Sequence, residues 1–232
     1  MSATVDREEV RRLFDAIATR YDRLNDLMTM GRHRAWKREV VSRSGAVPGS
    51  RVLDLCTGTG DLALGLAAAV GPDGKVTAVD GSEEMLALAR RRPGAARVSW
   101  LRADALALPF APAAFDGVTV GFGLRNLWAL DAGLAEIRRV LRPGGRAVSL
   151  DLSKPRAGLL ARLARAYEAH VVPGMAILAG APAAPYRYLA ASNEAFPDRP
   201  GLMAHFERAG FAQVGGLDLG LGAVAIVWGT AG

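Results

Sequence analysis

Val52-Leu53-Asp54-Leu55-Cys56-Thr57-Gly58-Thr59-Gly60-Asp61-Leu62-Ala63 is the stretch that decides the fold of this chain. Its apolar beginning is typical of a buried strand, which leads into a glycine turn and then into a helix-forming run. Gly58 and Gly60 lack a Cβ atom, so backbone N–H groups at the beginning of the helix can approach a ligand closely. The stretch therefore predicts a nucleotide-cofactor site.

Three acidic residues stand at the ends of three successive apolar runs, and they indicate what the ligand is. Asp54 ends the first run, Asp80 ends residues 75–80, and Asp104 follows residues 98–102. Asp80 is suited to accept both hydroxyls of an adenosine ribose, and Asp104 is suited to accept from the exocyclic amine of adenine. A lone acid at a strand end often only caps the next turn. Three in succession favour an adenosyl ligand.

Two cofactors fit the glycine turn. Gly58-x-Gly60-x-x-Ala63 satisfies the loose dinucleotide fingerprint G-x-G-x-x-G/A. However, a carboxylate such as that of Asp54 is unfavourable beside two phosphate charges. The same carboxylate attracts the sulfonium and ammonium groups of S-adenosylmethionine. The charge argument favours S-adenosylmethionine over a nicotinamide dinucleotide.

Composition sets the class of protein. The chain has 232 residues, of which 50% are hydrophobic, enough for the core of one α/β domain. The single Cys56 cannot form an internal disulfide, and we find neither a signal-peptide pattern nor about 18 uninterrupted apolar residues. We therefore expect a cytoplasmic protein, in which Cys56 is a small buried thiol beside the glycine turn.

The formal net charge of +6 and the pI of about 10.1 allow three interpretations: nucleic-acid binding, contact with an anionic membrane, or solubility. Five cations gather near the N-terminus, at Arg32, Arg34, Lys37, Arg38 and Arg43. They are not interleaved with several aromatic residues, and no zinc-ligand spacing is present, so nucleic acid is not an expected partner. The run Arg90–Arg92 ends a helix predicted from Glu83, where cations complement the helix dipole.

Apolar runs and helical patterns alternate along the chain, which predicts a mostly parallel sheet. The expected strands are residues 51–55, 75–80, 98–102, 115–121 and 145–152. Residues 141–146 contain Pro-Gly-Gly and predict a helix stop and a turn before the fifth strand. Near the C-terminus, residues 211–219 and 223–229 are joined by a short Gly-Leu-Gly link, which predicts an antiparallel hairpin.

We expect one domain over residues 1–232, in four parts. These are a helical N-terminal cover (1–47), a cofactor-binding core (48–155), an insertion that shapes the substrate pocket (156–197), and a last helix with the terminal hairpin (198–232). Within the insertion, residues 171–182 are apolar and rich in helix breakers. Such a segment could line a pocket for an apolar substrate, contact a membrane, or pack as ordinary core.

The whole chain resembles the demethylmenaquinone and ubiquinone C-methyltransferase family. Besides the glycine turn, the resemblance rests on Phe14-Asp15-Ala16-Ile17-Ala18-Thr19-Arg20-Tyr21-Asp22, Asn25-Asp26, Gly31-Arg32-His33-Arg34-Ala35-Trp36-Lys37, Gly121-Phe122-Gly123-Leu124-Arg125-Asn126, Arg139-Val140-Leu141-Arg142-Pro143-Gly144-Gly145, Asp151-Leu152-Ser153-Lys154-Pro155, Tyr186-Arg187-Tyr188-Leu189, Phe196-Pro197 and Ala209-Gly210-Phe211. The chain departs from the family pattern at Gly121, at Asp151-Leu152 and at Asn193-Glu194. At these three positions, family members commonly have serine, Glu-Phe and Ser-Ile, respectively.

The resemblance implies a Rossmann-like class I methyltransferase fold. The implied sheet has seven strands, mostly parallel, with the antiparallel hairpin and helical additions. Its cofactor contacts would fall on Thr59, Asp80, Asp104 and Ala105, with backbone approach at Gly58 and Gly60, and Met85 would pack on the adenine.

The implied reaction is methyl transfer from S-adenosylmethionine, without a metal, to a ring carbon of a reduced prenylated quinone. A hydroquinone carbon becomes nucleophilic when the neighbouring hydroxyl loses its proton, so the site must stabilise a phenolate. The resemblance makes Arg125, Asn126 and Tyr21 the catalytic candidates. Arg125 remains protonated, and it would stabilise the phenolate, directly or through a water held by Asn126, while Tyr21 closes over the pocket. The alternative for Arg125 is a structural ion pair.

These residues limit the class of substrate and partner but do not identify a single substrate or partner. The chain length leans toward demethylmenaquinol rather than the ubiquinol precursor as acceptor. A dual-purpose enzyme, a methyltransferase for another lipophilic molecule and a nicotinamide-binding module are the alternatives. Because a prenylated quinol resides in a bilayer, the basic N-terminal segment suggests peripheral contact with the anionic inner face of the membrane. A homodimer is compatible with the sequence, although no motif argues for it.

Overall fold

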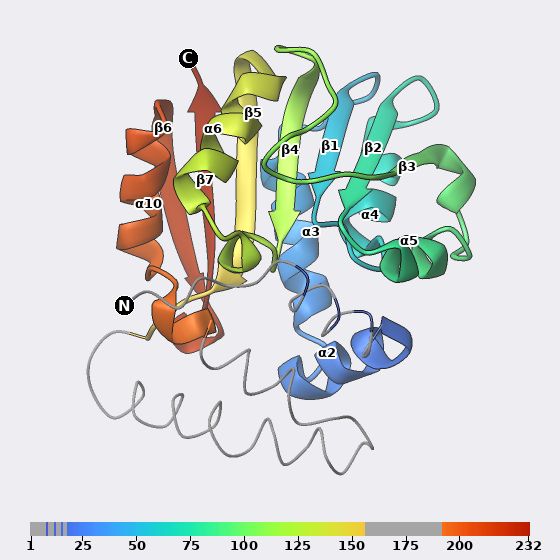
Figure 1. The fold of residues 1–232 in the computed structure, drawn as a ribbon, viewed down its shortest axis with the longest axis horizontal. Coiled ribbons are helices and arrows are strands. Elements are labelled where there is room, and N and C mark those ends of the chain that lie inside the picture. The colour runs from blue at the N-terminus through green and yellow to red at the C-terminus, as the bar shows by residue number, and fades with distance from the viewer. Residues whose placement is uncertain (1–7, 9–11, 13–14, 16–17, 156–191) are drawn as a thin grey trace.

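The computed structural model of the chain describes residues 8, 12, 15, 18–155 and 192–232. Seven strands form one sheet in the order β3-β2-β1-β4-β5-β7-β6 (Figure 1). Their bounds are β1 Arg51–Leu55, β2 Lys75–Asp80, β3 Val98–Arg102, β4 Phe115–Gly121, β5 Leu141–Leu152, β6 Phe211–Leu219 and β7 Val224–Ala231. The first five strands pair in parallel, and β7 is antiparallel to both β5 and β6. The predicted mostly parallel sheet with an antiparallel hairpin is confirmed.

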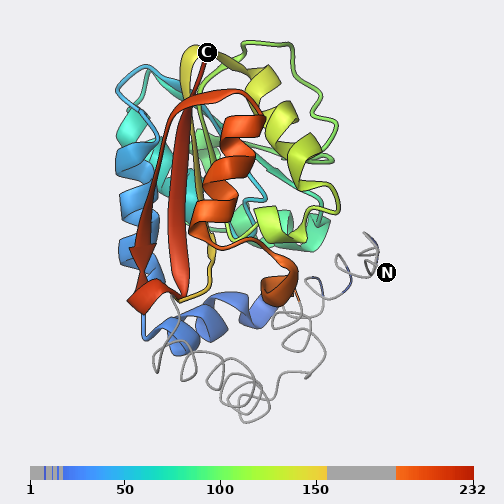
Figure 2. The same cartoon turned by 90° about the vertical axis from the view of Figure 1, so that its left-hand side faces the viewer.

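Helices cover both faces of the sheet, as the side view in Figure 2 shows. The described α-helices are α2 Tyr21–Thr29, α3 His33–Arg43, α4 Asp61–Val70, α5 Glu83–Ala89, α6 Leu130–Val140 and α10 Arg199–Arg208. Shorter 3₁₀ turns are η1 Ala18–Arg20, η2 Ala95–Arg97, η3 Leu124–Asn126 and η5 Gly220–Gly222. Helices α3 and α4 lie on one face, whereas α6 and α10 lie on the other (Figure 2).

The core fills the space between the sheet and these two layers. On the α6 and α10 side, Leu134, Ile137 and Phe206 are completely or almost completely buried. On the other face, Val40 of α3 and Leu66 of α4 are completely buried. Burial of such apolar side chains is the main favourable term in folding, so the sheet that carries the site is held from both sides.

Most strand bounds agree with the sequence-based expectation, and β5 shows why one does not. The strand begins at Leu141 directly after α6, not at residue 145. Its register with β4 shifts between Phe115 and Gly117, because Phe115 pairs with Leu141 and Gly117 with Arg146. Pro-Gly-Gly is therefore accommodated as an irregularity within the strand and not as a turn before it.

One helix and one strand also end at residues other than those predicted. The helix predicted from Glu83 to Arg92 ends at Ala89, so Arg92 lies beyond it. The last strand runs from Val224 to Ala231 rather than over residues 223–229. Residues 156–191, which hold the apolar segment 171–182 and most of the expected substrate-pocket insertion, lie outside the described residues. Among those that are described, no helix is long and apolar enough to span a membrane.

The parallel strands present their carboxyl ends at one edge of the sheet. In Figure 1 this is the lower edge, and α2 lies across it. Ligands of open α/β sheets bind at this edge, where the strand order reverses. Here the order reverses between β1 and β4, which are neighbours in the sheet.

Candidate functional site

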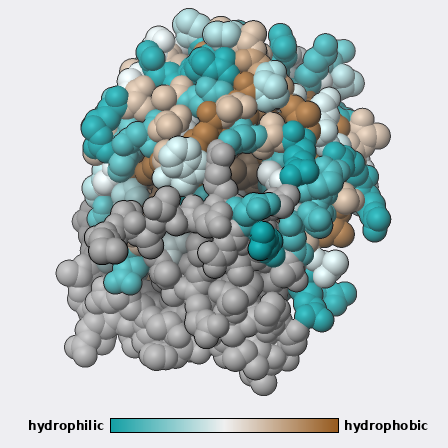
Figure 3. Space-filling view, in the orientation of Figure 1, coloured by the Kyte–Doolittle hydropathy of each residue, from teal (hydrophilic) through white to brown (hydrophobic). Residues whose placement is uncertain are grey.

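A cavity of about 620 Å³ opens at the carboxyl ends of β1, β2, β3 and β4. Figure 3 shows this face hollowed there, with brown apolar side chains in the hollow. Its lining comes mostly from the residues that follow these four strands: Leu55, Cys56, Gly58, Asp80, Gly81, Ser82, Arg102, Ala103, Asp104, Ala105, Leu106, Gly121, Phe122, Gly123, Asn126, Leu127 and Trp128. Glu8, Tyr21, Val79 and Met85 complete it. A cavity of this size can hold a small ligand and bury most of its surface.

The glycine turn after β1 forms one wall of the cavity. Gly58 has a φ angle of +56°, and Gly60, the N-cap of α4, has a φ angle of +87°. A Cβ atom on Gly60 would lie 2.6 Å from the Trp100 ring, which is too close for any side chain. Glycine is therefore required at position 60 for two reasons, the left-handed backbone conformation and the close packing of Trp100.

Asp80 connects this turn to the end of β2. One carboxylate oxygen accepts from the Gly58 N–H at 2.8 Å, and the other accepts from the Ser82 N–H at 2.9 Å. Burial raises the pKa of Asp80, and these backbone N–H groups oppose the rise. A carboxylate offers about four lone pairs, so Asp80, which lines the cavity, retains acceptor capacity beyond these two bonds. Such a carboxylate fits the paired hydroxyls of a ribose.

Three more predicted cofactor contacts also line the cavity. Met85 is the third residue of α5, and its N–H donates to the Ser82 hydroxyl at 3.1 Å. Asp104 and Ala105 follow β3, and Asp104 accepts from the Leu106 N–H at 3.0 Å. The loops after β2 and β3 thus bring an apolar side chain and a second carboxylate toward the same space as Asp80.

Asp54 lies in a different place. It is completely buried and does not line the cavity. Its two oxygens accept from the hydroxyls of Thr57 and Thr119, each at 2.6 Å. Burial raises the pKa of Asp54 to about 6, although both threonine hydroxyls oppose the shift. In this structure the carboxylate joins the glycine turn to β4 through hydrogen bonds. Attraction of a cofactor cation by Asp54 stays a prediction.

Thr59 is turned away from the cavity and toward α2. Its hydroxyl donates to Asp22 at 2.7 Å. Behind this contact, Asp61 at the beginning of α4 forms ion pairs with both Lys37 and Arg92. Burial opposes ionisation of Asp61, but the two cations outweigh it and lower its pKa to about 2.

This network joins α2 and α3 to the glycine turn, and the sequence reasoning did not identify it. Arg92 was expected only to complement a helix dipole, whereas its guanidinium pairs with Asp61 and donates to the Thr59 carbonyl at 3.0 Å. The spacing of these residues along the chain gives no signal for such contacts. They arise because the basic N-terminal segment folds back onto the beginning of α4.

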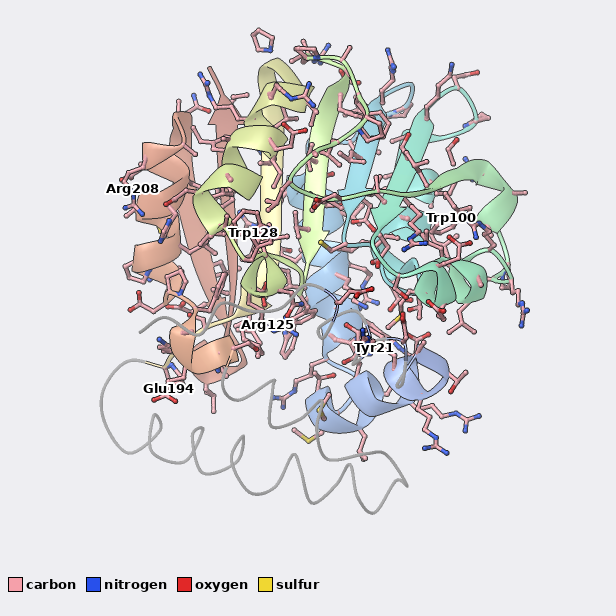
Figure 4. All side chains as sticks on the ribbon, in the orientation of Figure 1. Tyr21, Trp100, Arg125, Trp128, Glu194 and Arg208 are labelled. Atoms are coloured by element: carbon pink, nitrogen blue, oxygen red, sulfur yellow. The ribbon has the colours of Figure 1, made fainter. Side chains whose placement is uncertain are left out.

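Two of the three catalytic candidates, Arg125 and Asn126, lie in η3, just after β4. Asn126 lines the cavity, and its Nδ2 donates to the Phe122 carbonyl at 3.1 Å. Tyr21, the first residue of α2, lines the cavity from the side of the N-terminal segment. Figure 4 shows Tyr21 and Arg125 at the same edge of the sheet.

Arg125 does not itself line the cavity. Its guanidinium pairs with Asp151 at 2.7 Å and donates to the Phe122 carbonyl at 2.7 Å. The Asp151 carboxylate also accepts from the Arg125 N–H at 3.2 Å. This geometry corresponds to the structural ion pair that the sequence left open for Arg125. A catalytic part for Arg125 stays a prediction.

Sequence reasoning missed several residues of the cavity wall. Ser82 caps α5, and its hydroxyl donates to Asp15. The serine that precedes two glutamates is a helix-start signal, and it could have pointed to Ser82. Arg102 and Trp128 also line the cavity, and Trp128 is 54% exposed at its edge. No local pattern marks these two residues.

Comparison with a family model and with curated proteins agrees with this geometry. The model described as the ubiE/COQ5 methyltransferase family matches residues 2–231. A Ubiquinone/menaquinone biosynthesis C-methyltransferase UbiE of Teredinibacter turnerae is 40% identical, over 99% of this chain and 94% of that protein. A 2-phytyl-1,4-naphtoquinone methyltransferase of Synechococcus elongatus is 43% identical, over 95% of this chain and 96% of that protein.

Solved structures share the fold at lower identity. A SAM-dependent methyltransferase of Thermotoga maritima, described as a possible histamine N-methyltransferase, superposes with a TM-score of 0.69 and 21% identity. It covers 96% of this chain and 100% of its own. A SAM-dependent methyltransferase from Aquifex aeolicus gives a TM-score of 0.65, also at 21% identity, over 91% of this chain and 98% of its own. At such identities the likeness concerns the fold alone.

Proposed function

This chain belongs to the ubiE/COQ5 methyltransferase family, and we propose that it methylates a ring carbon of a reduced prenylated quinone, with demethylmenaquinol as the acceptor. The methyl donor of the family and of the fold is S-adenosylmethionine. The proposal depends chiefly on one observation. The cavity brings the carboxylates of Asp80 and Asp104 together with the polar turn that contains Asn126. An adenosyl group and a second, flatter molecule can therefore meet in one cavity.

The donor end of the cavity is the part formed by β2 and β3. Asp80 would accept the ribose hydroxyls, Asp104 the adenine amine, and Met85 would pack on the adenine ring. Burial of Asp80 is consistent with this assignment, because a carboxylate in low dielectric gains most from hydroxyl donors. S-adenosylmethionine supplies an electrophilic methyl group when it is bound.

The acceptor end would be formed by the turn after β4 and by Tyr21 from α2. The reaction needs a ring carbon held in line with the methyl group and a ring oxygen that has lost its proton. Asn126 lines the cavity and would orient that oxygen or an ordered water. Arg125 lies one residue away and would act from behind the wall through its positive charge, which the Asp151 carboxylate partly balances. Tyr21 would cover the bound acceptor and exclude water from the cavity.

The names of the relatives support the acceptor class. One relative is named for ubiquinone and menaquinone biosynthesis and the other for a phytylated naphthoquinone. A naphthoquinol ring is common to menaquinone and the second name, which favours demethylmenaquinol here. The first name covers both pathways, so a dual-purpose enzyme is the second candidate.

Methyl transfer from isotope-labelled S-adenosylmethionine tests the proposal. The purified chain is incubated under reducing conditions with demethylmenaquinol and, separately, with the matching ubiquinol precursor. We expect label in the naphthoquinol and none when the quinone is left oxidised. Label in both quinols would support the dual-purpose enzyme. Label in neither, with S-adenosylmethionine still bound, would overturn the acceptor assignment.

A further inference from the structure

The outer face of α2 carries an unusual stripe of side chains. Arg23 and Leu27 are four residues apart, which places them on one side of α2, and Met30 follows as the residue at which the helix ends; all three are exposed. Leu27 is 47% exposed and Met30 is 74% exposed. Large exposed apolar side chains usually stand singly, so two of them within four residues of one another call for an explanation.

A third apolar side chain extends this surface. Leu221 in η5 is 76% exposed and has a φ angle of +60°. Its neighbour Gly220 packs against α3, because a Cβ atom at that glycine would lie 3.4 Å from the Trp36 ring. Figure 1 shows that η5, at the lower end of β6 and β7, and α2 lie at the same end of the molecule. Among the described residues, five large apolar side chains are exposed, and three of them therefore lie at this end of the molecule.

The charges around these three side chains are predominantly positive. The carboxylate of Asp26 accepts from both His33 and Arg34, and that of Asp22 accepts from Thr59. By contrast, Arg23 and Arg32 are exposed and form no ion pair with any residue that the structure describes. These two acids are engaged by internal contacts, whereas Arg23 and Arg32 are left to the solvent.

The structure also revises which cations of the basic segment are available. Arg34 pairs with Asp26, and Lys37 pairs with Asp61 while only 14% of its side chain is exposed. These two were expected to face a membrane, but their charges are balanced within the protein. Arg32 and Arg38, which were also expected to face a membrane, are exposed and form no ion pair with a described residue. Arg32 follows Met30 in the chain, and Arg23 lies on the same side of α2 as Leu27.

We propose that the α2–α3 corner, defined by Leu27, Met30 and Leu221 together with Arg23 and Arg32, docks onto the surface of an anionic lipid bilayer. Apolar tips of this kind enter the headgroup region, and arginines next to them pair with anionic headgroups. The combination fits a surface that is anionic outside and apolar beneath.

The position of the corner relative to the cavity indicates how docking would deliver the substrate. This step rests on the proposed function. Helix α2 begins with Tyr21, which lines the cavity, and ends beside Met30, which lies in the corner. The helix therefore links the cavity and the docking surface directly. A lipid-soluble quinol could then pass from the bilayer into the cavity without crossing bulk water.

Vesicle sedimentation of the full chain tests the docking without any substrate. Vesicles of phosphatidylcholine mixed with phosphatidylglycerol are compared with vesicles of phosphatidylcholine alone. We expect binding to the mixed vesicles only, and weaker binding as salt is raised. The double variant R23Q/R32Q should bind the mixed vesicles about tenfold or more weakly. The variant L27S/M30S should also lose binding.

Matched controls come from the opposite end of the molecule. Val47, which precedes β1, is 59% exposed, and Arg97, which precedes β3, is exposed and forms no ion pair with a described residue. V47S and R97Q should bind the mixed vesicles as the parent does. If the parent binds both kinds of vesicle equally or neither, or if the corner variants bind as the controls do, the proposal is overturned.

A second readout separates this proposal from the proposed function. Methyl transfer to a short-chain, water-soluble quinol does not require docking, so L27S/M30S should methylate it at the parental rate. Methylation of that quinol without vesicle binding by the parent would overturn the docking and leave the function standing. Corner-dependent vesicle binding without methylation of any quinol would support the docking and overturn the function.

Discussion

The Arg125 guanidinium lies 2.7 Å from the Asp151 carboxylate, and the two side chains are only 5% and 1% exposed. The pair joins η3, which follows β4, to the end of β5. Loss of one partner leaves the other charge buried without its counter-ion. We therefore expect Asp151→Asn to lower the free energy of unfolding by roughly 3–5 kcal/mol in urea denaturation. The control is the pair of Arg142 with Asp116, in which the arginine side chain is 61% exposed, and Arg142→Gln should cost at most about 1 kcal/mol. Equal effects would contradict the buried-pair interpretation.

Replacement of the polar side chains at η3 should separate catalysis from structure. Asn126 lines the cavity and Arg125 does not, so we expect Asn126→Ala to lower kcat by roughly a hundredfold and to leave the S-adenosylmethionine Kd almost unchanged. Arg125→Ala should also lower turnover by more than it weakens cofactor binding. Steady-state kinetics and calorimetry give the two quantities. An equal loss in both would assign that side chain to structure alone.

Asp80 is the residue whose loss should weaken the cofactor most. Asp80→Asn keeps the shape of the side chain but removes the charge that accepts hydroxyl donors. Hydrogen bonds to a charged group contribute about 1.5–3 kcal/mol, so the S-adenosylmethionine Kd should rise roughly tenfold to a hundredfold in isothermal calorimetry. Asp73, exposed between α4 and β2, is the matched control. Unchanged affinity in Asp80→Asn would refute the assignment of the ribose site.

Gly60 should tolerate no side chain. Gly60→Ala would bring a Cβ atom to 2.6 Å from the Trp100 ring, at a φ angle of +87°. We expect a loss of about 2–4 kcal/mol in the free energy of unfolding, from backbone strain and overpacking together. Gly49 has a φ angle of +86° with nothing within 4 Å of the same atom, so Gly49→Ala measures the strain alone, about 1 kcal/mol. A comparable loss in both variants would show that Trp100 moves aside freely.

Asp54 should make stability depend on pH in an unusual direction. Burial raises its pKa from 3.8 to about 6, so between these values the folded protein keeps a proton that the unfolded chain releases. The contribution of Asp54 to stability is therefore greatest below about pH 4 and is lost as the pH rises through 6. The loss is at most about 3 kcal/mol. Thermal unfolding of Asp54→Asn over this range should lack that component, and an unchanged pH profile would contradict it.

The sequence predicted that Gly58 and Asp80 share one edge of the sheet because this depends on local pattern. It did not show that Asp54 and Thr59, also predicted to contact the cofactor, lie away from the cavity. The residue types at Gly58 and Asp80 follow from a strand, a turn and a second strand, and their spacing fixes which sheet edge they share. Trp128 and the Asp22–Thr59 contact could not be predicted in the same way, because they depend on how distant segments pack. The beginning of β5 was mispredicted for the same reason, because it depends on pairing with another strand. Pro-Gly-Gly reads as a turn in isolation, yet pairing with β4 draws it into a strand.

The position of β7 between β5 and β6 has a consequence for how the sheet is assembled. Within the described sheet, β6 pairs only with β7, although β6 precedes β7 along the chain. During synthesis β6 therefore emerges from the ribosome before the strand that connects it to the rest of the sheet. Until β7 follows, both β5 and β6 present unpaired edges, which are templates for pairing with other chains. We expect correct placement of β7 between them to remove both templates at once.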